Sequence, residues 1–141
     1  KEGILDNSLV VIVGDHTGVH KYYNHGINQL SQKEAWYLDD GNPIVPLIIY
    51  DKDIKEPKTL ETIGGQIDIM PTMLYLLGID KSLYENTALG RNLLNTNRSY
   101  AILTNGTIKG ENLSTEDEEI IKSSLDLSDK MIRANYFKKV N

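Results

Sequence analysis

The chain has 141 residues, of which 40% are hydrophobic, and this is enough for one domain with an apolar core. Its 15 basic residues are outnumbered by 20 acidic ones and do not cluster with aromatic residues, which excludes nucleic acid as an expected partner. Without cysteine the chain has no disulfide, thiolate metal site or cysteine nucleophile, and without a long apolar run it is expected to be soluble as given.

The first predicted element is a strand over Leu9–Val13. Its β-branched run closes at Gly14, which is typical of a strand buried on both faces at the centre of a parallel sheet. Asp15 and His16 follow directly. Because ligands of open α/β sheets bind beyond the carboxyl ends of the strands, this turn is the first candidate site.

Three segments follow the first turn. An imperfect helical stripe predicts a helix over Gly26–Leu38, and an apolar run predicts a second buried strand over Val45–Tyr50. The charged residues and helix breakers of 51–65 predict a surface loop.

The segment 66–80 predicts a helix. Pro71 is tolerated in its first turn, and Gly78 is a natural C-terminal cap. Its predicted inner face consists of Ile69, Met73, Leu76 and Leu77.

The C-terminal part predicts a hairpin and a long helix. Asn105-Gly106 is a hairpin turn signal, and Thr115 with Glu118 predicts a capping box for the helix. Its predicted apolar seam consists of Ile120, Leu127, Met131 and Ala134, with Ile121, Leu125 and Ile132 beside it. The order of elements predicts an α/β architecture with an α+β tail.

The Asp15-His16 turn has two interpretations. Adjacent side chains of a regular strand point to opposite faces, so both reach one ion only where the backbone bends, and Gly14 and Gly18 permit a bend. A carboxylate and an imidazole suit zinc or manganese better than calcium. A capping aspartate beside a surface histidine explains the same residues, and spacing alone does not choose between the two.

Two other functional interpretations of the first strand and its turn have less support. A nucleotide-binding ATPase needs a glycine-rich loop ending in Lys and Ser or Thr, and a Ser-His-Asp hydrolase needs a Gly-x-Ser-x-Gly turn; the sequence has neither. We expect His20 and His25, taken by spacing alone, to be solvated or to pack against loops.

In combination, "VVIVGDHTG", "VPLIIY" and "GGQIDIMPTMLYLLGID" resemble the C-terminal half of the sulfatase and alkaline phosphatase superfamily. Within it, "GDHTG…NHGI", "GGQIDIMPT" and "SDKMIRANYFKKV" are similar to the lipoteichoic acid synthases, membrane-anchored phosphoglycerol transferases of Gram-positive bacteria. The resemblance implies that 1–141 is the C-terminal part of a sulfatase-like catalytic domain and a piece of a longer chain. The implied fold is an α/β sandwich with a central mixed sheet flanked by helices.

The resemblance also implies a site. Asp15 and His16 would ligate a single divalent metal, Mn²⁺ first, with Mg²⁺ or Zn²⁺ as alternatives. Gln66 stands where two-metal relatives place a histidine, so Gln66 and His25 are candidates for polar support of the site. Asp68 would be structural and help to begin the helix that follows it.

The implied reaction needs residues that this chain does not contain. In the complete enzyme a threonine nucleophile attacks the phosphate of phosphatidylglycerol, and glycerol phosphate passes to a cell-envelope polymer. That nucleophile belongs to the missing N-terminal half, and Thr17 is not a substitute, so no catalytic residue is assigned here and the chain alone is expected to be inactive. The implied partners are that half, anionic phospholipid and the glycerol phosphate polymer, at the extracellular face of the cell membrane.

Two alternatives stay open. One is a different enzyme of the superfamily, such as a sulfatase or a phosphoethanolamine transferase. The other is a non-catalytic module that binds a partner or a polymer. The nucleophile in the missing half separates the enzymes, and loss of metal dependence would favour the module.

Overall fold

The computed structural model of the protein describes residues 3–16, 24–32, 44–111 and 113–140. The chain divides into two compact units, Lys1–Lys58 and Thr59–Asn141, and each is described by itself. The described residues form a mixed α/β structure with two small antiparallel sheets. The central sheet flanked by helices stays a prediction.

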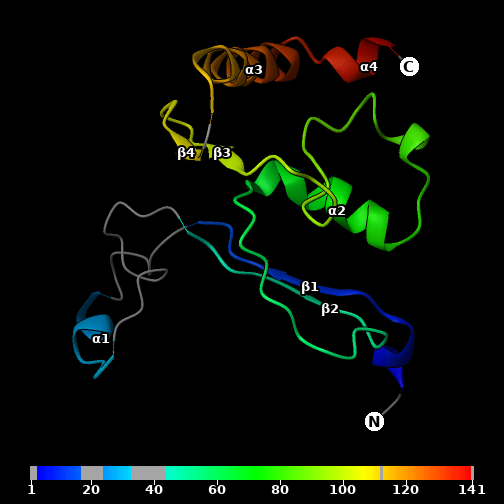
Figure 1. The fold of residues 1–141 in the computed structure, drawn as a ribbon, viewed down its shortest axis with the longest axis vertical. Helices are drawn as coiled ribbons and strands as arrows, with labels where there is room; N and C mark the ends of the chain where they lie inside the picture. The colour runs from blue at the N-terminus through cyan, green and yellow to red at the C-terminus, as the bar shows by residue number, and fades with distance from the viewer. Residues whose placement is uncertain (1–2, 17–23, 33–43, 112, 141) are drawn as a thin grey trace. The chain divides into compact units, whose positions relative to one another are not determined.

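The first unit is built around the pair of strands β1 (Val10–Val13) and β2 (Leu47–Tyr50) (Figure 1). The two strands pair antiparallel over four residues each. The N–H of Gly14 donates to the carbonyl of Pro46 at 3.0 Å, which continues the ladder by one hydrogen bond. Both predicted strands are therefore confirmed.

Their predicted environment is wrong. The strands are antiparallel, and Ile12 and Ile48, which face each other, are 57% and 55% exposed. A β-branched run specifies an extended backbone, but it does not specify the direction of the neighbouring strand or what covers each face. Within the described residues of this unit, β1 and β2 are each paired along one edge, so neither lies at the centre of a sheet.

The helix predicted over Gly26–Leu38 is much shorter. Helix α1 covers Asn24–Asn28, and the following residues up to 32 form a turn and a bend, with Leu30 N–H donating to the Ile27 carbonyl at 3.0 Å. The rest of the predicted helix, 33–38, lies outside the described residues. The unit begins with the 3₁₀ helix η1 (Ile4–Asn7).

Helix α2 (Ile69–Leu76) in the second unit lies within the segment predicted to be helical, and Pro71 and Gly78 occupy their predicted places. It follows the 3₁₀ helix η4 (Gln66–Asp68), and Pro71 falls in its first turn. Gly78 has φ 71°, and the N–H groups of Gly78 and Ile79 donate to the carbonyls of Tyr75 and Leu74, both at 3.0 Å. This is a Schellman cap, in which glycine supplies the left-handed residue.

The predicted inner face of α2 is partly correct. Ile69, Met73 and Leu76 are half-buried, but Leu77 is 57% exposed because the helix has ended before it. The fully buried residues of α2 are Pro71 and Thr72.

A hairpin follows the loop that contains the 3₁₀ helix η5 (Lys81–Leu83). Strands β3 (Tyr100–Ile102) and β4 (Ile108–Gly110) pair antiparallel, as the sequence predicts. Gly106 has φ 82°, and the Asn105 side chain accepts the N–H of Thr107 at 2.9 Å. These contacts define the turn.

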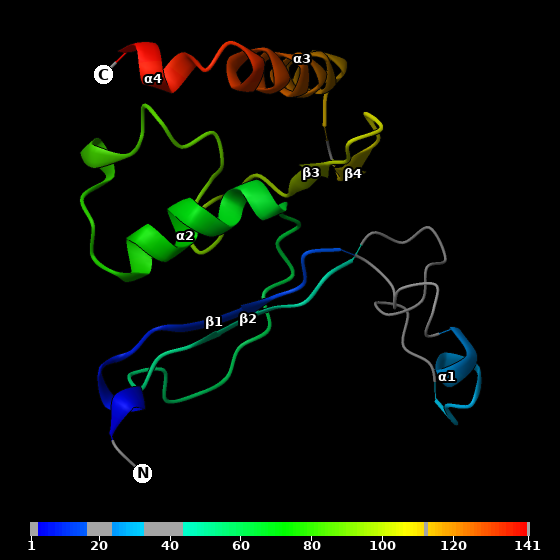
Figure 2. The ribbon, with the colours of Figure 1, turned by 180° about the vertical axis from the view of Figure 1, so that it is seen from behind.

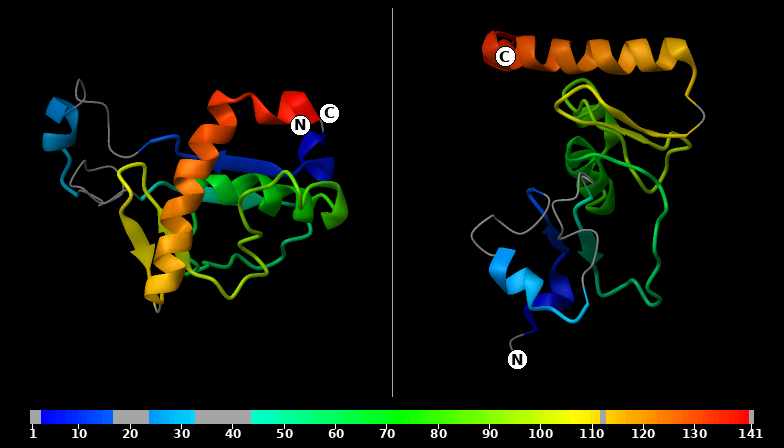
Figure 3. Two further views of the ribbon diagram at one scale, coloured as in Figure 1. Left: turned by 90° about the horizontal axis from the view of Figure 1, so that it is seen from above. Right: turned by 90° about the vertical axis from the view of Figure 1, so that its left-hand side faces the viewer.

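Helix α3 (Thr115–Arg133) lies beside the β3–β4 hairpin, and α4 (Tyr136–Val140) follows it (Figures 2 and 3). The chain leaves α3 through Asn135, whose φ of 51° is left-handed. None of the helices formed by the described residues is long and apolar enough to cross a membrane.

Two details of α3 differ from the prediction. The cap is Ser114 with Asp117, since Ser114 is still extended and Thr115 is already helical. The predicted seam is only partly correct: Ile120 and Leu127 are 62% and 55% exposed, whereas Met131 is half-buried and Ile121, which was predicted beside the seam, is buried. The half-buried residues on the Ile121 face are Glu118, Leu125, Ser128 and Met131.

Candidate functional site

The turn after β1 brings together the two residues that the sequence singles out. Gly14 packs closely against the residues just before β2, and a Cβ there would lie 3.0 Å from the Cβ of Val45. The strand ends before Asp15, so Asp15 and His16 are not held on opposite faces of a ladder. Their side chains approach each other, with 3.6 Å between Asp15 Oδ1 and His16 Nε2.

This pair fits a divalent ion. Ligand atoms bonded to one ion at about 2.1 Å in tetrahedral geometry lie roughly 3.4 Å apart, close to the 3.6 Å between Asp15 Oδ1 and His16 Nε2. The side chains of Asp15 and His16 are 91% and 62% exposed. Within the described residues, no group of three or more His, Asp or Glu side chains is placed to hold an ion. Binding of a metal at this turn stays a prediction.

The other predicted site residues lie as follows. His25 is exposed on α1, and its Nε2 lies 3.0 Å from Nε2 of Gln29, the residue directly after that helix. Gln66 is exposed at the start of η4, in the second unit. His20 and Thr17 lie outside the described residues. Support of a metal by Gln66 or His25 stays a prediction.

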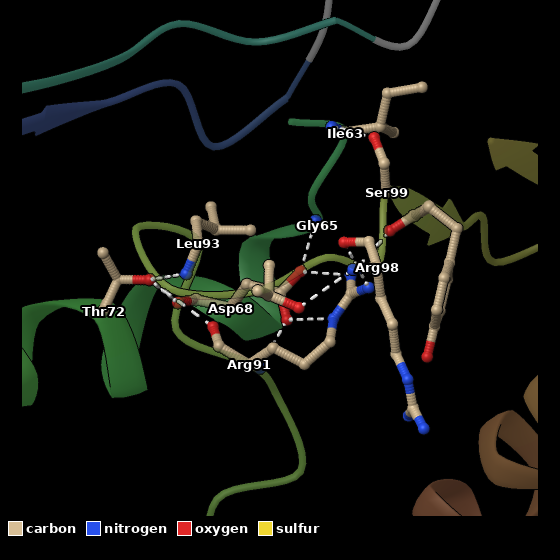
Figure 4. Close-up of polar contacts among 10 residues, drawn as sticks. Ile63, Gly65, Asp68, Thr72, Arg91, Leu93, Arg98 and Ser99 are labelled. Atoms are coloured by element: carbon tan, nitrogen blue, oxygen red, sulfur yellow. Dashed lines mark hydrogen bonds and ion pairs between the residues drawn. The ribbon is translucent and has the colours of Figure 1, made fainter. Parts of the chain in front are cut away.

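A buried ionic cluster in the second unit is centred on Asp68, which is 1% exposed (Figure 4). Its Oδ2 accepts the N–H of Gly65 at 2.9 Å and Nη2 of Arg91 at 3.0 Å. Its Oδ1 accepts the backbone N–H of Arg91 at 2.7 Å. The carboxylate therefore holds the turn before α2 and the segment around Arg91 together. This confirms the predicted structural role of Asp68, although its side chain makes no cap hydrogen bond to α2.

Arg91 extends the cluster toward the hairpin. Its Nη2 also donates to the carbonyl of Tyr100 at 2.6 Å, and its guanidinium carbon lies 3.9 Å above the Tyr100 ring, a cation–π contact. The Nη1 atom donates to the carbonyl of Arg98 at 3.3 Å. Arg91 thereby fixes the chain that leads into β3.

Thr72 joins the same two segments through its hydroxyl. The hydroxyl donates to the carbonyl of Asp68 at 2.6 Å and accepts the N–H of Leu93 at 3.0 Å. Because the Asp68 charge is compensated and its oxygens accept several donors, the cluster is suited to holding structure. Sequence reasoning missed Arg91, since a partner 23 residues away leaves no periodic signal.

The sulfatase family model matches residues 1–79, more than half of the chain. A lipoteichoic acid synthase-like protein of Bacillus subtilis is 32% identical over 111 residues, covering 75% of this chain and 18% of that protein. Lipoteichoic acid synthase 1 of Bacillus subtilis is 40% identical over 85 residues, and the lipoteichoic acid synthase of Staphylococcus aureus is 34% identical over 93 residues. Each of these two matches covers 60% of this chain and 13% of the relative.

This chain thus spans 13–18% of the length of these three relatives. No solved structure matches it. The matched residues 1–79 include the Asp15-His16 turn and η4 with α2. The chain therefore belongs to the sulfatase family, as a protein similar to the lipoteichoic acid synthases.

Proposed function

We propose that this chain is the C-terminal, metal-binding part of a phosphoglycerol transferase. The observation that carries the proposal is the approach of Asp15 and His16 to 3.6 Å at the end of β1, in a chain of the sulfatase family. The names of the relatives support the substrate class, because they are lipoteichoic acid synthases.

In this proposal Asp15 and His16 hold one divalent ion, with Mn²⁺ first and Mg²⁺ or Zn²⁺ as alternatives. The bound ion would lower the pKa of a coordinated hydroxyl and offset the charge that develops on a phosphoryl oxygen. Asp15 contributes a negative charge to the ion, and His16 contributes a lone pair and must be neutral to do so. Gln66 and His25 are proposed to support the site by hydrogen bonding.

The rest of the reaction is assigned to the other part of the full-length protein. A threonine there attacks the phosphate of phosphatidylglycerol, diacylglycerol leaves, and glycerol phosphate then passes to a hydroxyl of an envelope polymer. Covalent catalysis divides one difficult displacement into two. The full-length protein would act at the outer face of the membrane to which it is anchored, and this chain alone would show no turnover.

The test is calorimetric titration of Mn²⁺, Mg²⁺ and Zn²⁺ into the full-length protein, beside Asp15→Asn and His16→Ala. Asp53→Asn is the matched control, because Asp53 is an exposed aspartate just after β2. Loss of one charged ligand is expected to weaken Mn²⁺ binding about tenfold or more, while Asp53→Asn binds like the parent.

Two results would contradict the proposal. If the full-length protein binds none of the three ions, Asp15 is a cap and the non-catalytic binding module becomes the better description. If it hydrolyses an aryl sulfate ester and leaves phosphatidylglycerol intact, the enzyme is a sulfatase.

A further inference from the structure

The last residues of the chain combine exposed apolar side chains with positive charge. Ile132, near the end of α3, is 76% exposed, and Tyr136 and Phe137 in α4 are 45% and 41% exposed. The two aromatic rings contact each other edge to face, with their centroids 5.5 Å apart. Lys138 is exposed, and Lys139 follows it in the sequence. These five residues are called the C-terminal patch.

The patch is positively charged in an acidic protein. Residues 130–141 contain four basic residues and no Asp or Glu, in a chain whose net charge is -5. The two cations at the end of α3 each pair with an aspartate one turn earlier in that helix. Lys138, in contrast, forms no ion pair within the part of the chain that the structure describes. The net charge of the patch therefore comes from its own lysines.

Charge is also divided along α3. Its first turn carries Glu116, Asp117 and Glu118, and its last turn carries Lys130 and Arg133. At about 1.5 Å of rise per residue, the helix separates these two ends by roughly 25 Å. An anionic surface would repel the first end and attract the second, so the end of α3 that carries the patch is the one suited to meet such a surface.

The patch lies at the edge of the second unit. Figures 1 and 2 show α2 and the β3–β4 hairpin on the same side of α3. Among the described residues of this unit, none covers Ile132 or the two rings well enough to bury them. The patch is therefore accessible to a partner.

A membrane accommodates this combination of side chains better than a protein surface does. Burying a lysine in a protein interface without a partner costs free energy. At a bilayer, the aliphatic stem of lysine lies along apolar groups while its ammonium group stays among the headgroups. Tyrosine is enriched at the same depth, because its ring is apolar and its hydroxyl is polar. Exposed isoleucine and phenylalanine side chains enter the boundary of the acyl chains.

We propose that the C-terminal patch docks on an anionic membrane, with Ile132 and the two aromatic rings at the acyl-chain boundary and the lysines among the headgroups. The proposal rests on the proposed function, which puts the full-length protein at the outer face of a membrane that contains phosphatidylglycerol, an anionic lipid. A negative surface potential attracts each lysine, and burial of the apolar side chains adds to the attraction. Docking would hold the second unit against the membrane that supplies the substrate.

Hydrogen exchange measured by mass spectrometry tests the docking in the full-length protein, reconstituted into nanodiscs. One set of discs contains phosphatidylcholine alone, and two others contain phosphatidylcholine mixed with phosphatidylglycerol or with phosphatidylserine. The backbone amides of 132–140 are expected to exchange more slowly in both kinds of anionic disc than in the neutral discs. This difference should shrink at high ionic strength, because salt screens the attraction.

The double variant Lys138→Glu and Lys139→Glu is expected to lose the difference between anionic and neutral discs. The matched control is Lys52→Glu with Lys55→Glu, which changes the net charge equally at two exposed lysines of the loop after β2. This control should keep the difference. Exchange of 115–129 reports whether α3 is folded and should be the same in both double variants.

Three results would overturn the proposal. The first is equal exchange of 132–140 in neutral and anionic discs; if that exchange is slow, another part of the protein covers the patch. The second is slower exchange with phosphatidylglycerol but not with phosphatidylserine, which would indicate recognition of one headgroup. The third is a Lys138→Glu, Lys139→Glu variant that behaves like the Lys52→Glu, Lys55→Glu control.

Failure of the proposed function is seen separately. Loss of the metal site appears in the Mn²⁺ titration, and it does not change the exchange expected for 132–140. If the full-length protein has no anchor and stays out of the discs, its proposed membrane location is contradicted. The same exchange comparison is then made with vesicles of the three lipid compositions, and equal exchange with all three overturns the docking as well.

Discussion

Arg91 donates to both carboxylate oxygens of Asp68, which stands 23 residues earlier in the chain. Its backbone N–H reaches Oδ1 at 2.7 Å and its Nη2 reaches Oδ2 at 3.0 Å. The Asp68 side chain is 2% exposed and the Arg91 side chain 18%, so solvent screens the pair weakly. The start of α2 and the segment that leads into β3 are therefore joined by one ion pair.

Arg91→Met is expected to lower the free energy of unfolding by about 3–5 kcal/mol, because it leaves the buried Asp68 charge without its partner. Arg91→Lys should recover part of this loss, since lysine keeps the charge but not the forked geometry. Chemical denaturation measures both. Lys122→Met, which breaks an exposed pair with Glu118, is the control and should cost at most about 1 kcal/mol. Equal losses for Arg91→Met and Lys122→Met would show that the cluster does not hold the unit together.

Gly90→Ala is expected to be strongly destabilising. A Cβ at Gly90 would overlap the carbonyl group of Ile67, which is backbone and cannot turn aside. Overpacking of this kind costs about 1–3 kcal/mol or more. Gly65→Ala is the matched control, because its Cβ would meet nothing closer than 3.8 Å. Thermal unfolding should show a lower midpoint for Gly90→Ala alone, and equal midpoints would contradict the packing of Gly90 against Ile67.

Substitution can distinguish the Ser114–Asp117 cap of α3 from the Thr115–Glu118 cap that the sequence predicts. Ser114→Ala should cost about 1 kcal/mol, because the Ser114 hydroxyl oxygen accepts the N–H of Asp117 at the first turn. Thr115→Ala should cost less than about 0.5 kcal/mol, as expected for an exposed helical position. Urea denaturation measures both. A larger loss at Thr115 would restore the Thr115–Glu118 capping box that the sequence predicts.

The same cap gives stability a pH dependence. Hydrogen bonds from the Ser114 side chain, and then from its backbone N–H, lower the pKa of the Asp117 carboxyl below 3.8, and the charge of Arg98 adds a smaller lowering. A lowered folded-state pKa means that the contribution of Asp117 is fully present above the unfolded-state pKa, about 3.9. It is lost as the pH falls through the lowered value.

NMR titration of the Asp117 carboxyl carbon measures this directly. In Ser114→Ala the Asp117 pKa should rise toward its ordinary value, because its main hydrogen-bond donor is gone. Ser123→Ala is the control, since the Ser123 hydroxyl donates to the Glu119 carbonyl within the helix. A pKa that Ser114→Ala leaves unchanged would contradict the assignment.

The sequence predicts correctly those features that are determined by the backbone geometry of a single residue. Pro71, Gly78 and Gly106 each act through their own backbone geometry, and each lies where the sequence places it. The buried, parallel environment predicted for the first strand was wrong, because strand pairing depends on residues far apart in the chain. The seam of α3 was only partly correct for a similar reason: several apolar stripes satisfy helical spacing, and only packing selects the one centred on Ile121.

The sequence also predicts one of the two residue pairs described above, Asp15 with His16, and misses the other, Asp68 with Arg91. Asp15 and His16 are neighbours in sequence, so a bend after the strand is enough to bring their side chains together. The Asp68–Arg91 pair had no such signal, because it depends on how the loop after α2 returns to the start of that helix. Whether a metal binds between Asp15 and His16 stays a prediction for the Mn²⁺ titration.

The β1–β2 pair has a consequence for handling the protein. Leu9–Val13 and Leu47–Tyr50 are short uncharged segments rich in β-branched residues, a composition that favours association between strands when it is exposed. A charge follows each segment closely: Asp15 comes after Gly14, and Asp51 comes directly after Tyr50. Such a charge acts as a gatekeeper against self-association. Neutralising Asp15 therefore removes a gatekeeper as well as a metal ligand, and light scattering should accompany every titration of that variant.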